Sequence, residues 1–554
     1  MTGIGVFLAG LIPAYFLACY LTFLYEGLFP FLFISLFCQI FCGVLLRFLA
    51  QGGFFSLKWR EEPGSVLLLA LAACLPLSAA LMSLMFPGLF DRRLLFMEGG
   101  LFATFSGLAV VSMPAALWLD RRMQQIGLYR IVEASAPVRA ARRNRAGLLL
   151  SLLFFSTYFI FAQSLNFPGF YTRDQYFETD ISDWIARLAS SQTNGILPVR
   201  AVHPAVLLFL RPIIWLLSLL LNADRLQAAF LLSAMAGAAC VFIVWLIVKG
   251  RTGSTFHALL SASLLGASAS HLLLSSMLET YIFSALALLA FCLLMHNDRN
   301  SLRSTVPLGV VIFGITVTNL AQACILYFLK SPRIKVVFQF LLAVVSLTLL
   351  LNILQVQLYP FTKPLYDPSN LLSEQKYGSN PFEARQWEGR LHLIARSVLL
   401  YGVVAPTPYI LKEELGAAVP NFRTFKVANG ELQVAGYKGF ADIVAKTWII
   451  LLGAAILLFV FDLFTSPRNM TYPISLTLCM GFSFALHFLY GDDPMLYSPN
   501  WVYALVLFVS ASFERGADNK WTQPVWVAFL GMMVFANLGL IRLILTVSLP
   551  SYGG

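Results

Sequence analysis

Long runs of apolar residues recur along the whole chain and are separated by short polar segments. Most runs are close to the roughly 20 residues that an α-helix needs to cross the hydrocarbon core of a bilayer. Hydrophobic residues make up 59% of the 554 residues and charged residues only 12%. The pattern predicts an all-α, polytopic integral membrane protein with about 15 transmembrane helices. The predicted crossings lie near 4–25, 28–46, 64–87, 97–119, 146–165, 226–248, 255–273, 280–295, a pair within 305–330, 336–358, 446–465, 472–490, 499–513 and 524–547.

Clusters of Lys and Arg alternate with these runs and predict the orientation of each helix, because basic residues concentrate in cytoplasmic loops. They place the N-terminus inside and the C-terminus outside. The segment 203–221 is expected to form a helix on the outer membrane surface, since its crossing would leave Lys249 and Arg251 outside. The clusters fall at 47–60, 121–145, 249–251, 299–303, 330–335, 468 and 515–520.

The chain divides into five predicted regions where hydropathy and charge change. The net charge of +11 is spread over the short loops of these regions, so no nucleic-acid partner is expected. The regions are an N-terminal four-helix membrane extension (1–120), a basic cytoplasmic linker (121–145), a membrane core (146–358) with a catalytic external loop (166–225), a long external loop (359–445) and C-terminal membrane helices (446–554).

Acidic residues gather on the predicted outer side. Glu178, Asp180 and Asp183 follow directly on the apolar helix 146–165, and Glu279 occupies the outer turn between two later helices. Carboxylates near a bilayer are costly unless they are hydrated, paired or chemically active. We therefore expect Asp180 and Glu279 to converge in a water-accessible pocket at the outer surface. The simpler interpretations are that Asp180 caps the next helix and that Glu279 only complements a helix dipole.

Further polar residues on the outer side are candidates for binding substrate. Arginine suits bidentate contact with a phosphate, and the long loop carries such residues at helical spacing. Ordinary roles remain open, namely a solvated amphipathic helix, acids of a surface turn and a histidine that orients a turn. The candidates are Asp183, His203, Arg385, Arg390, His392, Asp492 and Asp493.

Three motifs in order carry a family resemblance. The first is Asp180-x-x-Asp183-Trp-Ile-Ala-Arg-Leu, followed by His203-Pro, and the second is Glu279 before an apolar helix. The third, Tyr490-Gly-Asp-Asp-Pro, precedes a late helix. Together they resemble the GT-C superfamily of polytopic glycosyltransferases, in the style of the protein mannosyltransferases and the lipid A aminoarabinose transferases. Ala205 stands where that family usually has a second Pro, and residues before 146 lie outside the resemblance.

The resemblance implies transfer of a monosaccharide from a polyprenyl-phosphate carrier to a lipid, glycan or protein acceptor at the extracytoplasmic face. Asp180 would then be the general base that takes the acceptor proton. Glu279 would assist, either by orienting the acceptor or, together with Asp180, by holding a divalent cation such as Mg²⁺ or Mn²⁺. No other cofactor is implied.

Other classes of protein are weighed against this interpretation. A lipid or solute transporter or flippase would explain many helices with few motifs, and a catalytically inactive membrane scaffold would need no chemistry. No Walker loop or metalloprotease motif is present, so nucleotide hydrolysis is not expected. The external loops lack an Asn-x-Ser/Thr acceptor, which favours a bacterial inner membrane with the active site facing outward.

Overall fold

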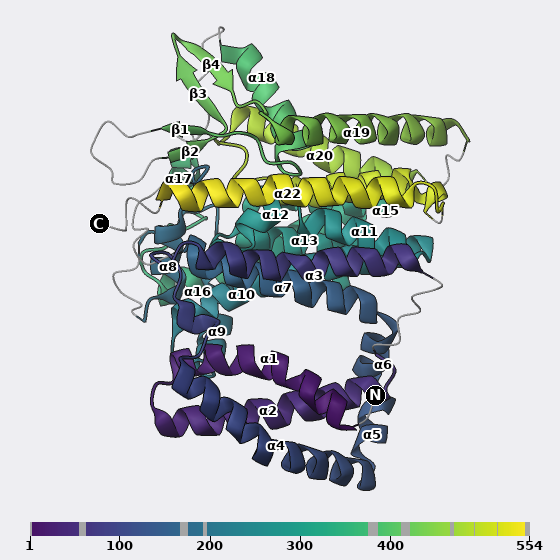
Figure 1. The fold of residues 1–554 in the computed structure, drawn as a ribbon. Helices are drawn as coiled ribbons and strands as arrows, with labels where there is room; N and C mark the ends of the chain where they lie inside the picture. Colours follow the sequence, from purple (N-terminus) through teal and green to yellow (C-terminus); the bar gives the residue numbers. More distant parts are fainter. Residues whose placement is uncertain are drawn as a thin grey trace.

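Helices that run side by side make up most of the protein (Figure 1). The computed structural model describes residues 3–54, 62–166, 176–191, 197–374, 386–411, 421–465, 470–491, 493–517 and 519–548. Within these ranges, ten helices are long and apolar enough to cross a membrane, as expected of an integral membrane protein. They are α1 (Gly3–Leu24), α2 (Leu28–Gln51), α3 (Pro63–Leu84), α4 (Gly99–Gln125), α7 (Arg145–Leu165), α10 (Arg225–Thr252), α16 (Ile334–Leu358), α19 (Phe440–Thr465), α20 (Thr471–Leu489) and α22 (Gln523–Ser548).

Shorter helices complete the bundle. The predicted helix 255–273 is broken, because Ser268 starts a new helix whose first turn it caps by accepting from the amide of His271 at 3.3 Å. The apolar short helices are α9 (Val206–Ser218), α11 (Thr255–Gly266), α13 (Tyr281–His296), α14 (Leu302–Ile315) and α21 (Pro499–Ser512). The others are α5 (Leu128–Ala134), α6 (Ala136–Arg143), α8 (Ile181–Ala189), α12 (Ala269–Leu274), α15 (Leu320–Lys330), α17 (Pro368–Leu372) and α18 (Trp387–Arg396).

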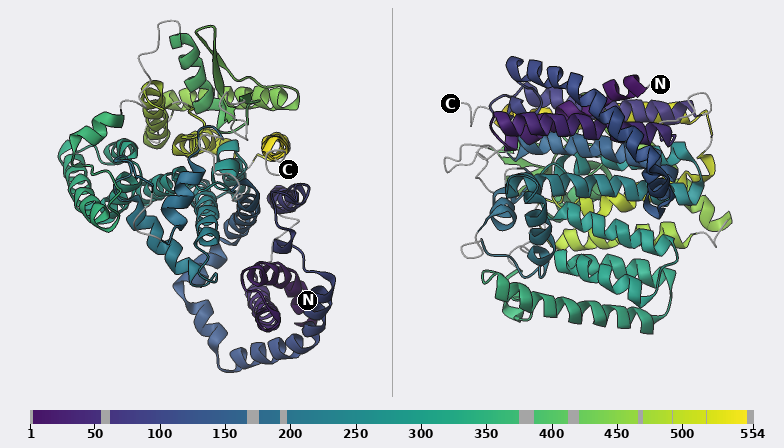
Figure 2. Two further views of the ribbon diagram at one scale, coloured as in Figure 1. Left: turned by 90° about the vertical axis from the view of Figure 1, so that its left-hand side faces the viewer. Right: turned by 90° about the horizontal axis from the view of Figure 1, so that it is seen from below.

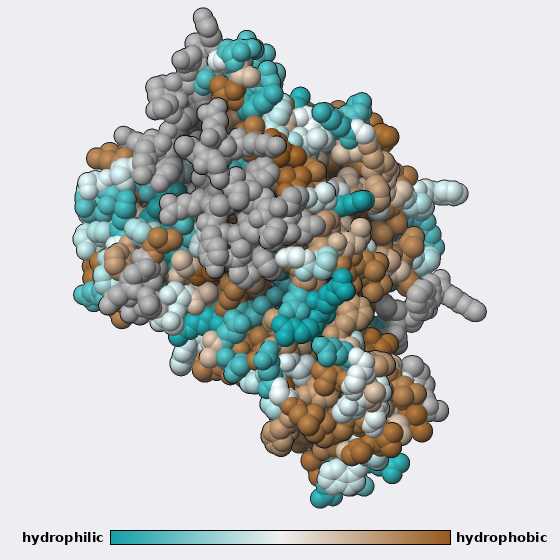
Figure 3. Space-filling model, turned by 60° about the vertical axis from the view of Figure 1, so that its left-hand side comes forward, coloured by the Kyte–Doolittle hydropathy of each residue, from teal (hydrophilic) through white to brown (hydrophobic). Residues whose placement is uncertain are grey.

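The N-terminal extension comprises three helices rather than the expected four. Helices α1, α2 and α4 form a bundle at the bottom of Figure 1, where Gly10 and Gly43 let α1 and α2 approach closely. Helix α3 instead packs on α7 and α11, because Leu68 and Leu75 are buried in the main core. The two glycines where α1 crosses α2 fit a membrane bundle, because small residues are typical of helix crossings in membranes. The lower lobe in Figure 3 presents a largely hydrophobic surface, as a bundle facing lipid would.

Two small antiparallel strand pairs lie in the long loop, where only helix and coil were expected. They are β1 (Tyr409–Leu411) with β2 (Asn421–Arg423), and β3 (Phe425–Ala428) with β4 (Glu431–Val434). Asn429 and Gly430 connect β3 to β4 with φ angles of 55° and 76°. Asn-Gly is the favoured pair for this two-residue hairpin turn, since both central residues need positive φ.

The two ends of the helix bundle differ in the elements they carry. In Figure 1, α8, α17, β1 and β2 lie at the left end, whereas α5 and α6 lie at the right end. The views in Figure 2 show the same helices end-on and from below. Helix α9 has 13 residues, about 20 Å of rise. Since α11, α14 and α21 have similar lengths, the surface position expected for 203–221 stays a prediction.

Candidate active site at the start of helix α8

The acidic segment after α7 forms a strained turn before it enters α8. Phe177 and Glu178 have φ angles of 55° and 66°, in the left-handed region that residues other than glycine rarely adopt. The amide of Phe177 donates to the carbonyl of Phe422 on β2 at 2.8 Å, so the long loop fixes this turn. Asp180 follows at the N-cap position of α8, yet its side chain accepts no capping hydrogen bond from the described amides of that helix. Capping therefore does not account for Asp180.

Asp180 and Glu279 meet although 99 residues separate them. The amide of Asp180 donates to Oε1 of Glu279 at 2.5 Å. Glu279 is only 1% exposed and lies in the turn between α12 and α13. Asn166, at the end of α7, shapes that turn by donating to the carbonyl of Ser276 at 2.7 Å and accepting from the amide of Leu278 at 2.9 Å. Burial, and then the nearby charge of Asp180, raises the pKa of Glu279 well above its usual range.

Helix α8 also carries a buried guanidinium group beside these acids. Nη2 of Arg187 is 3.0 Å from Oδ2 of Asp183, one turn earlier, and its guanidinium carbon lies 4.8 Å from the ring centre of Trp184. Burial lowers the pKa of Arg187, and the negative charges of Asp183, Asp180 and Glu279 oppose this effect. All three acids therefore act electrostatically on one arginine. Asp183 serves first as the ion-pair partner that orients it.

His203 supports this helix as a neutral, buried side chain. Its ring packs edge-on against Trp184, with centroids 5.4 Å apart, and its Nδ1 lies 2.6 Å from the carbonyl oxygen of Ile315. Burial lowers the pKa of His203 to about 3. A neutral imidazole whose Nδ1–H donates to a carbonyl positions α8 against α14 and is not a proton acceptor at that nitrogen.

A second arginine connects three separate segments at the same end of the bundle. Nε of Arg200 donates to Glu374 Oε2 at 2.9 Å and to Oε1 at 3.2 Å, and its Nη2 donates to the hydroxyl of Tyr490 at 2.6 Å. Arg200 and Glu279 both act electrostatically on Tyr281, the first residue of α13. The pair Arg200–Glu374 thus ties the segment between α8 and α9 to the long loop beside the Glu279 turn.

Three buried polar atoms next to the Asp180–Glu279 contact have no hydrogen-bond partner among the residues that the structure describes. They are Oγ1 of Thr179, Oγ1 of Thr280 and Nε of Arg187. Thr179 and Thr280 directly flank Asp180 and Glu279 in the chain. Buried polar groups are nearly always hydrogen-bonded in folded proteins. Their grouping at one spot indicates a place where a polar ligand or water belongs.

Glu178 and Asp493 have structural partners. Glu178 forms an ion pair with Arg423 and accepts from the amide of Asp493 at 3.1 Å. Asp493 in turn accepts from the amide and the hydroxyl of Thr424, both at 2.7 Å. These bonds join the acidic turn, β2 and the loop after α20. Burial raises the pKa of Asp493, and the bonds from Thr424 oppose the shift. Asp492 lies outside the described residues.

The basic candidates of the long loop have different surroundings from those expected. Nη2 of Arg390 is buried and donates to the carbonyls of His487 at 2.6 Å and Gly491 at 2.5 Å. His392 is exposed on the other side of α18, and Arg385 lies outside the described residues. The observed contacts of Arg390 thus hold the C-terminal end of α20. The sequence favoured Arg385 and Arg390 as phosphate-binding arginines, whereas Arg187 and Arg200 are the described arginines near the acids.

The residues present do not by themselves fit a divalent cation. Among the described ranges, no group of three or more His, Cys, Asp or Glu side chains could hold a metal ion. The Glu279 carboxylate accepts the backbone amide of Asp180, and Arg187 brings a positive charge close to Asp183, Asp180 and Glu279. We therefore derive no step through a metal.

The expected pocket shared by Asp180 and Glu279 is not delineated. Neither acid lines any of five cavities formed by described residues, and residues 167–175, which directly precede the acidic turn, lie outside the described part of the chain. The largest of these five, about 470 Å³, is at the opposite end of the bundle.

No protein-family model, curated protein or solved structure matches the chain. The resemblance to GT-C enzymes therefore rests on the residues quoted above.

Proposed function

We propose that this protein is a membrane glycosyltransferase of the GT-C type. It moves a monosaccharide from a polyprenyl-phosphate carrier to a hydroxyl acceptor at the extracytoplasmic face, in a bacterial inner membrane. The shorter apolar helices bring the number of crossings to about 15, and α8 and the Glu279 turn face outward. The observation that carries the proposal is the hydrogen bond from the backbone amide of Asp180 to the Glu279 carboxylate, which brings the two acidic residues of the motif pattern into contact.

Asp180 is the general base in this proposal. Its side chain is partly exposed and makes no capping hydrogen bond to α8. During transfer the acceptor oxygen forms a bond to the anomeric carbon while the bond from that carbon to the phosphate oxygen breaks. Asp180 takes the acceptor proton and the polyprenyl phosphate leaves with the electron pair. A positioned base of this kind contributes roughly 10²- to 10⁴-fold in rate.

Arg187 and Arg200 support the departing phosphate. Arg187 is buried, fixed by Asp183, and keeps an Nε atom without a partner among the described residues. Arg200 is held by Glu374 close to the same acids. Positive groups that are already in place stabilise charge as it develops on a leaving group. Glu279, buried and with a raised pKa, orients Asp180 and the acceptor rather than serving as a second free carboxylate.

The test uses full-length protein in nanodiscs with radiolabelled undecaprenyl-phosphate sugars: a hexose, an N-acetylhexosamine and an aminopentose. Release of undecaprenyl phosphate and sugar transfer to an envelope extract are measured for wild type, Asp180→Asn and Glu279→Gln. Matched controls are Asp442→Asn, at a partly exposed ion pair with Lys446, and Glu431→Gln, at an exposed position on β4, both away from the site. Asp180→Asn is expected to lose at least about 100-fold in turnover while still binding the donor. Unchanged transfer by Asp180→Asn, or movement of donor across the bilayer without transfer, contradicts the proposal.

A further inference from the structure

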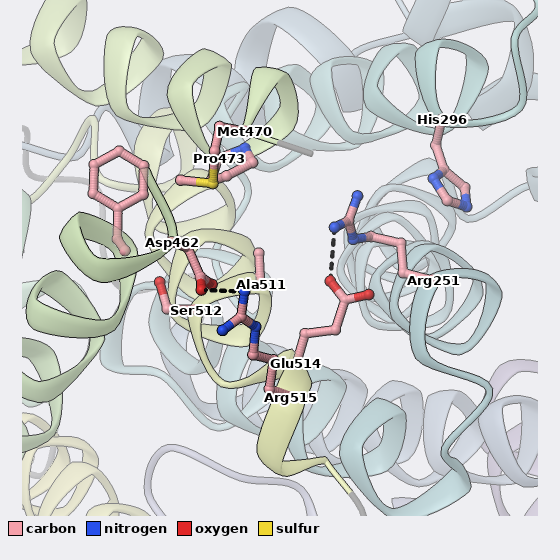
Figure 4. Close-up of a pocket in the computed structure, with 10 residues that line it drawn as sticks. Arg251, His296, Asp462, Met470, Pro473, Ala511, Ser512, Glu514 and Arg515 are labelled. Atoms are coloured by element: carbon pink, nitrogen blue, oxygen red, sulfur yellow. Dashed lines mark hydrogen bonds and ion pairs between the residues drawn. The ribbon is translucent and has the colours of Figure 1, made fainter. Parts of the chain in front are cut away.

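A pair of cavities lies at the end of the bundle opposite Asp180 and Glu279. The larger, about 470 Å³, has Arg251 and His296 on one wall and Asp462 and Arg515 on another (Figure 4). Arg251 pairs with Glu514 at 2.7 Å, and Arg515 with Asp462 at 2.8 Å. Helix α13 runs from the Glu279 turn to His296, a rise of about 24 Å. These cavities are therefore remote from the proposed active site.

The smaller cavity, about 240 Å³, shares Arg251 and His296 with the larger one and carries more positive charge. The rest of its polar lining comes from Lys330, Thr471, Tyr472 and Ser475. No acid is among its lining residues in the described part of the chain. Helix α10 reaches His296 closely because position 250 is a glycine, where a Cβ would come within 2.9 Å of Nε2 of His296.

Two hydrogen-bond donors at this cavity are buried and have no partner among the described residues. They are Nε of Arg251 and the hydroxyl of Tyr472. The guanidinium carbon of Arg251 lies 4.5 Å from the ring centre of Tyr472, so both donors belong to one packed pair. Lys330 adds an ammonium group, whose partner Asp298 is itself largely exposed. Two donors without acceptors, beside two cations whose carboxylate partners lie outside the cavity lining, suit an anion.

We propose that the smaller cavity binds a phosphate group, and that the larger cavity receives the polar remainder of the molecule that bears it. Arg251 and the hydroxyl of Tyr472 donate to the phosphate oxygens, and Lys330 supplies a further charge. The source that suits this place is the headgroup of an anionic phospholipid, since basic pockets between helices at a cytoplasmic surface commonly bind such headgroups. A free phosphate ion shares the chemistry. The inference does not depend on glycosyl transfer.

The experiment measures ligand-induced thermal stabilisation of the full-length protein in a neutral maltoside detergent. The probes are phosphatidylglycerol in mixed micelles, inorganic phosphate, and phosphatidylcholine as the zwitterionic comparison. The variants are Tyr472→Phe, Arg251→Gln and, as a matched control, Arg303→Gln, an exposed arginine outside both cavities. Tyr472→Phe removes one donor and leaves no new unpaired group, so it preserves folding while weakening binding.

Phosphatidylglycerol is expected to raise the unfolding temperature of wild type and Arg303→Gln more than phosphatidylcholine does. The apparent affinity is expected to fall roughly tenfold in Tyr472→Phe and further in Arg251→Gln, as for loss of hydrogen bonds to a charged group. A response to inorganic phosphate that is lost in the same variants also supports the site and identifies free phosphate as a source. Equal ligand responses in wild type and Tyr472→Phe, or none at all, overturn the proposal.

Discussion

Asp183 and Arg187 lie one turn apart on α8 and form an ion pair of 3.0 Å that is almost fully buried. This geometry separates the role of the two residues. Asp183 uses its carboxylate to hold the guanidinium group, whereas Arg187 retains a buried Nε without a partner among the described residues. In the proposed site, Arg187 is therefore the residue of the pair that binds the donor phosphate.

Arg187→Gln is expected to lower kcat/KM for the polyprenyl-phosphate donor more than Asp183→Asn does. In the proposed reaction Arg187 contacts the donor phosphate, whereas Asp183 only positions the guanidinium group of Arg187. Arg187→Lys should recover part of the loss, because charge returns without the planar geometry. Breaking a buried pair also costs stability, on the order of 3–5 kcal/mol, so unfolding temperatures must accompany the kinetics. A fall in unfolding temperature with kcat/KM unchanged would leave Arg187 a structural residue.

Glu279 predicts a specific dependence of stability on pH. Its pKa is raised in the folded state by burial and by Asp180, so the folded protein holds the proton where the unfolded chain has lost it. The resulting stabilisation is complete below the unfolded pKa and declines as pH rises from about 4.5 toward the folded pKa. Glu279→Gln removes this decline, and its amide oxygen still accepts from the amide of Asp180.

Unfolding temperatures of wild type and Glu279→Gln, measured between pH 4 and pH 9, check this expectation. The difference should grow in favour of Glu279→Gln as pH rises, and Glu431→Gln should follow wild type. Parallel curves for wild type and Glu279→Gln would mean that Glu279 ionises freely in the fold.

Asp493 and Asp180 should separate a structural acid from a catalytic one. In Asp493→Asn the side-chain NH₂ replaces one of the two oxygens that accept from the amide and hydroxyl of Thr424. This loss is expected to lower the free energy of unfolding by roughly 1–3 kcal/mol. Its transfer activity should fall only as far as the protein loses folded population. Asp180→Asn should keep the wild-type unfolding temperature and lose turnover. The same ratio of activity to folded protein in both variants would contradict this assignment.

Hydropathy predicted most of the helix positions, because a membrane requires long apolar runs. The expected helix at 336–358 is observed at 334–358, for example. The break at Ser268 could not be predicted, because Ser268 is only one of several serines in this apolar run. The hairpin of β3 and β4 had a local signal, Asn429-Gly430 between two segments in which apolar and polar residues alternate. The prediction of an all-α protein left it out.

The candidate site was predictable in its acids and not in its arginines. Asp180 and Glu279 stand out as acids beside apolar runs, and the structure brings them together. Arg187 had a weak local signal, four residues after Asp183 on one face of a predicted helix. Arg200 had none, because its partners Glu374 and Tyr490 are 174 and 290 residues away in the chain. Pairings of that kind depend on the tertiary fold alone.

Gly389 on α18 is predicted to be required for docking of the β3–β4 hairpin. A Cβ there would lie 2.5 Å from the carbonyl oxygen of Leu432 on β4, and backbone does not yield cheaply. Gly389→Ala should therefore loosen the hairpin, although alanine favours a helix by about 1 kcal/mol. Gly436→Ala is the control, since nothing lies within 4 Å of its Cβ. Hydrogen exchange of 425–434 should accelerate in Gly389→Ala only, and equal exchange in both variants would refute the contact.

Arg200 and Glu374 should be energetically coupled in catalysis, because their bidentate contact holds the long loop beside the Glu279 turn. Arg200→Gln, Glu374→Gln and the double variant form a thermodynamic cycle on kcat/KM for the donor. If Glu374 acts only by positioning Arg200, the double variant loses no more than Arg200→Gln alone. Tyr490→Phe removes the third contact, at 2.6 Å from Arg200, and should cost less than either charge, since the ion pair remains. Additive losses in the cycle would show that Glu374 and Arg200 act independently, and the loop would then need another explanation for its place at the site.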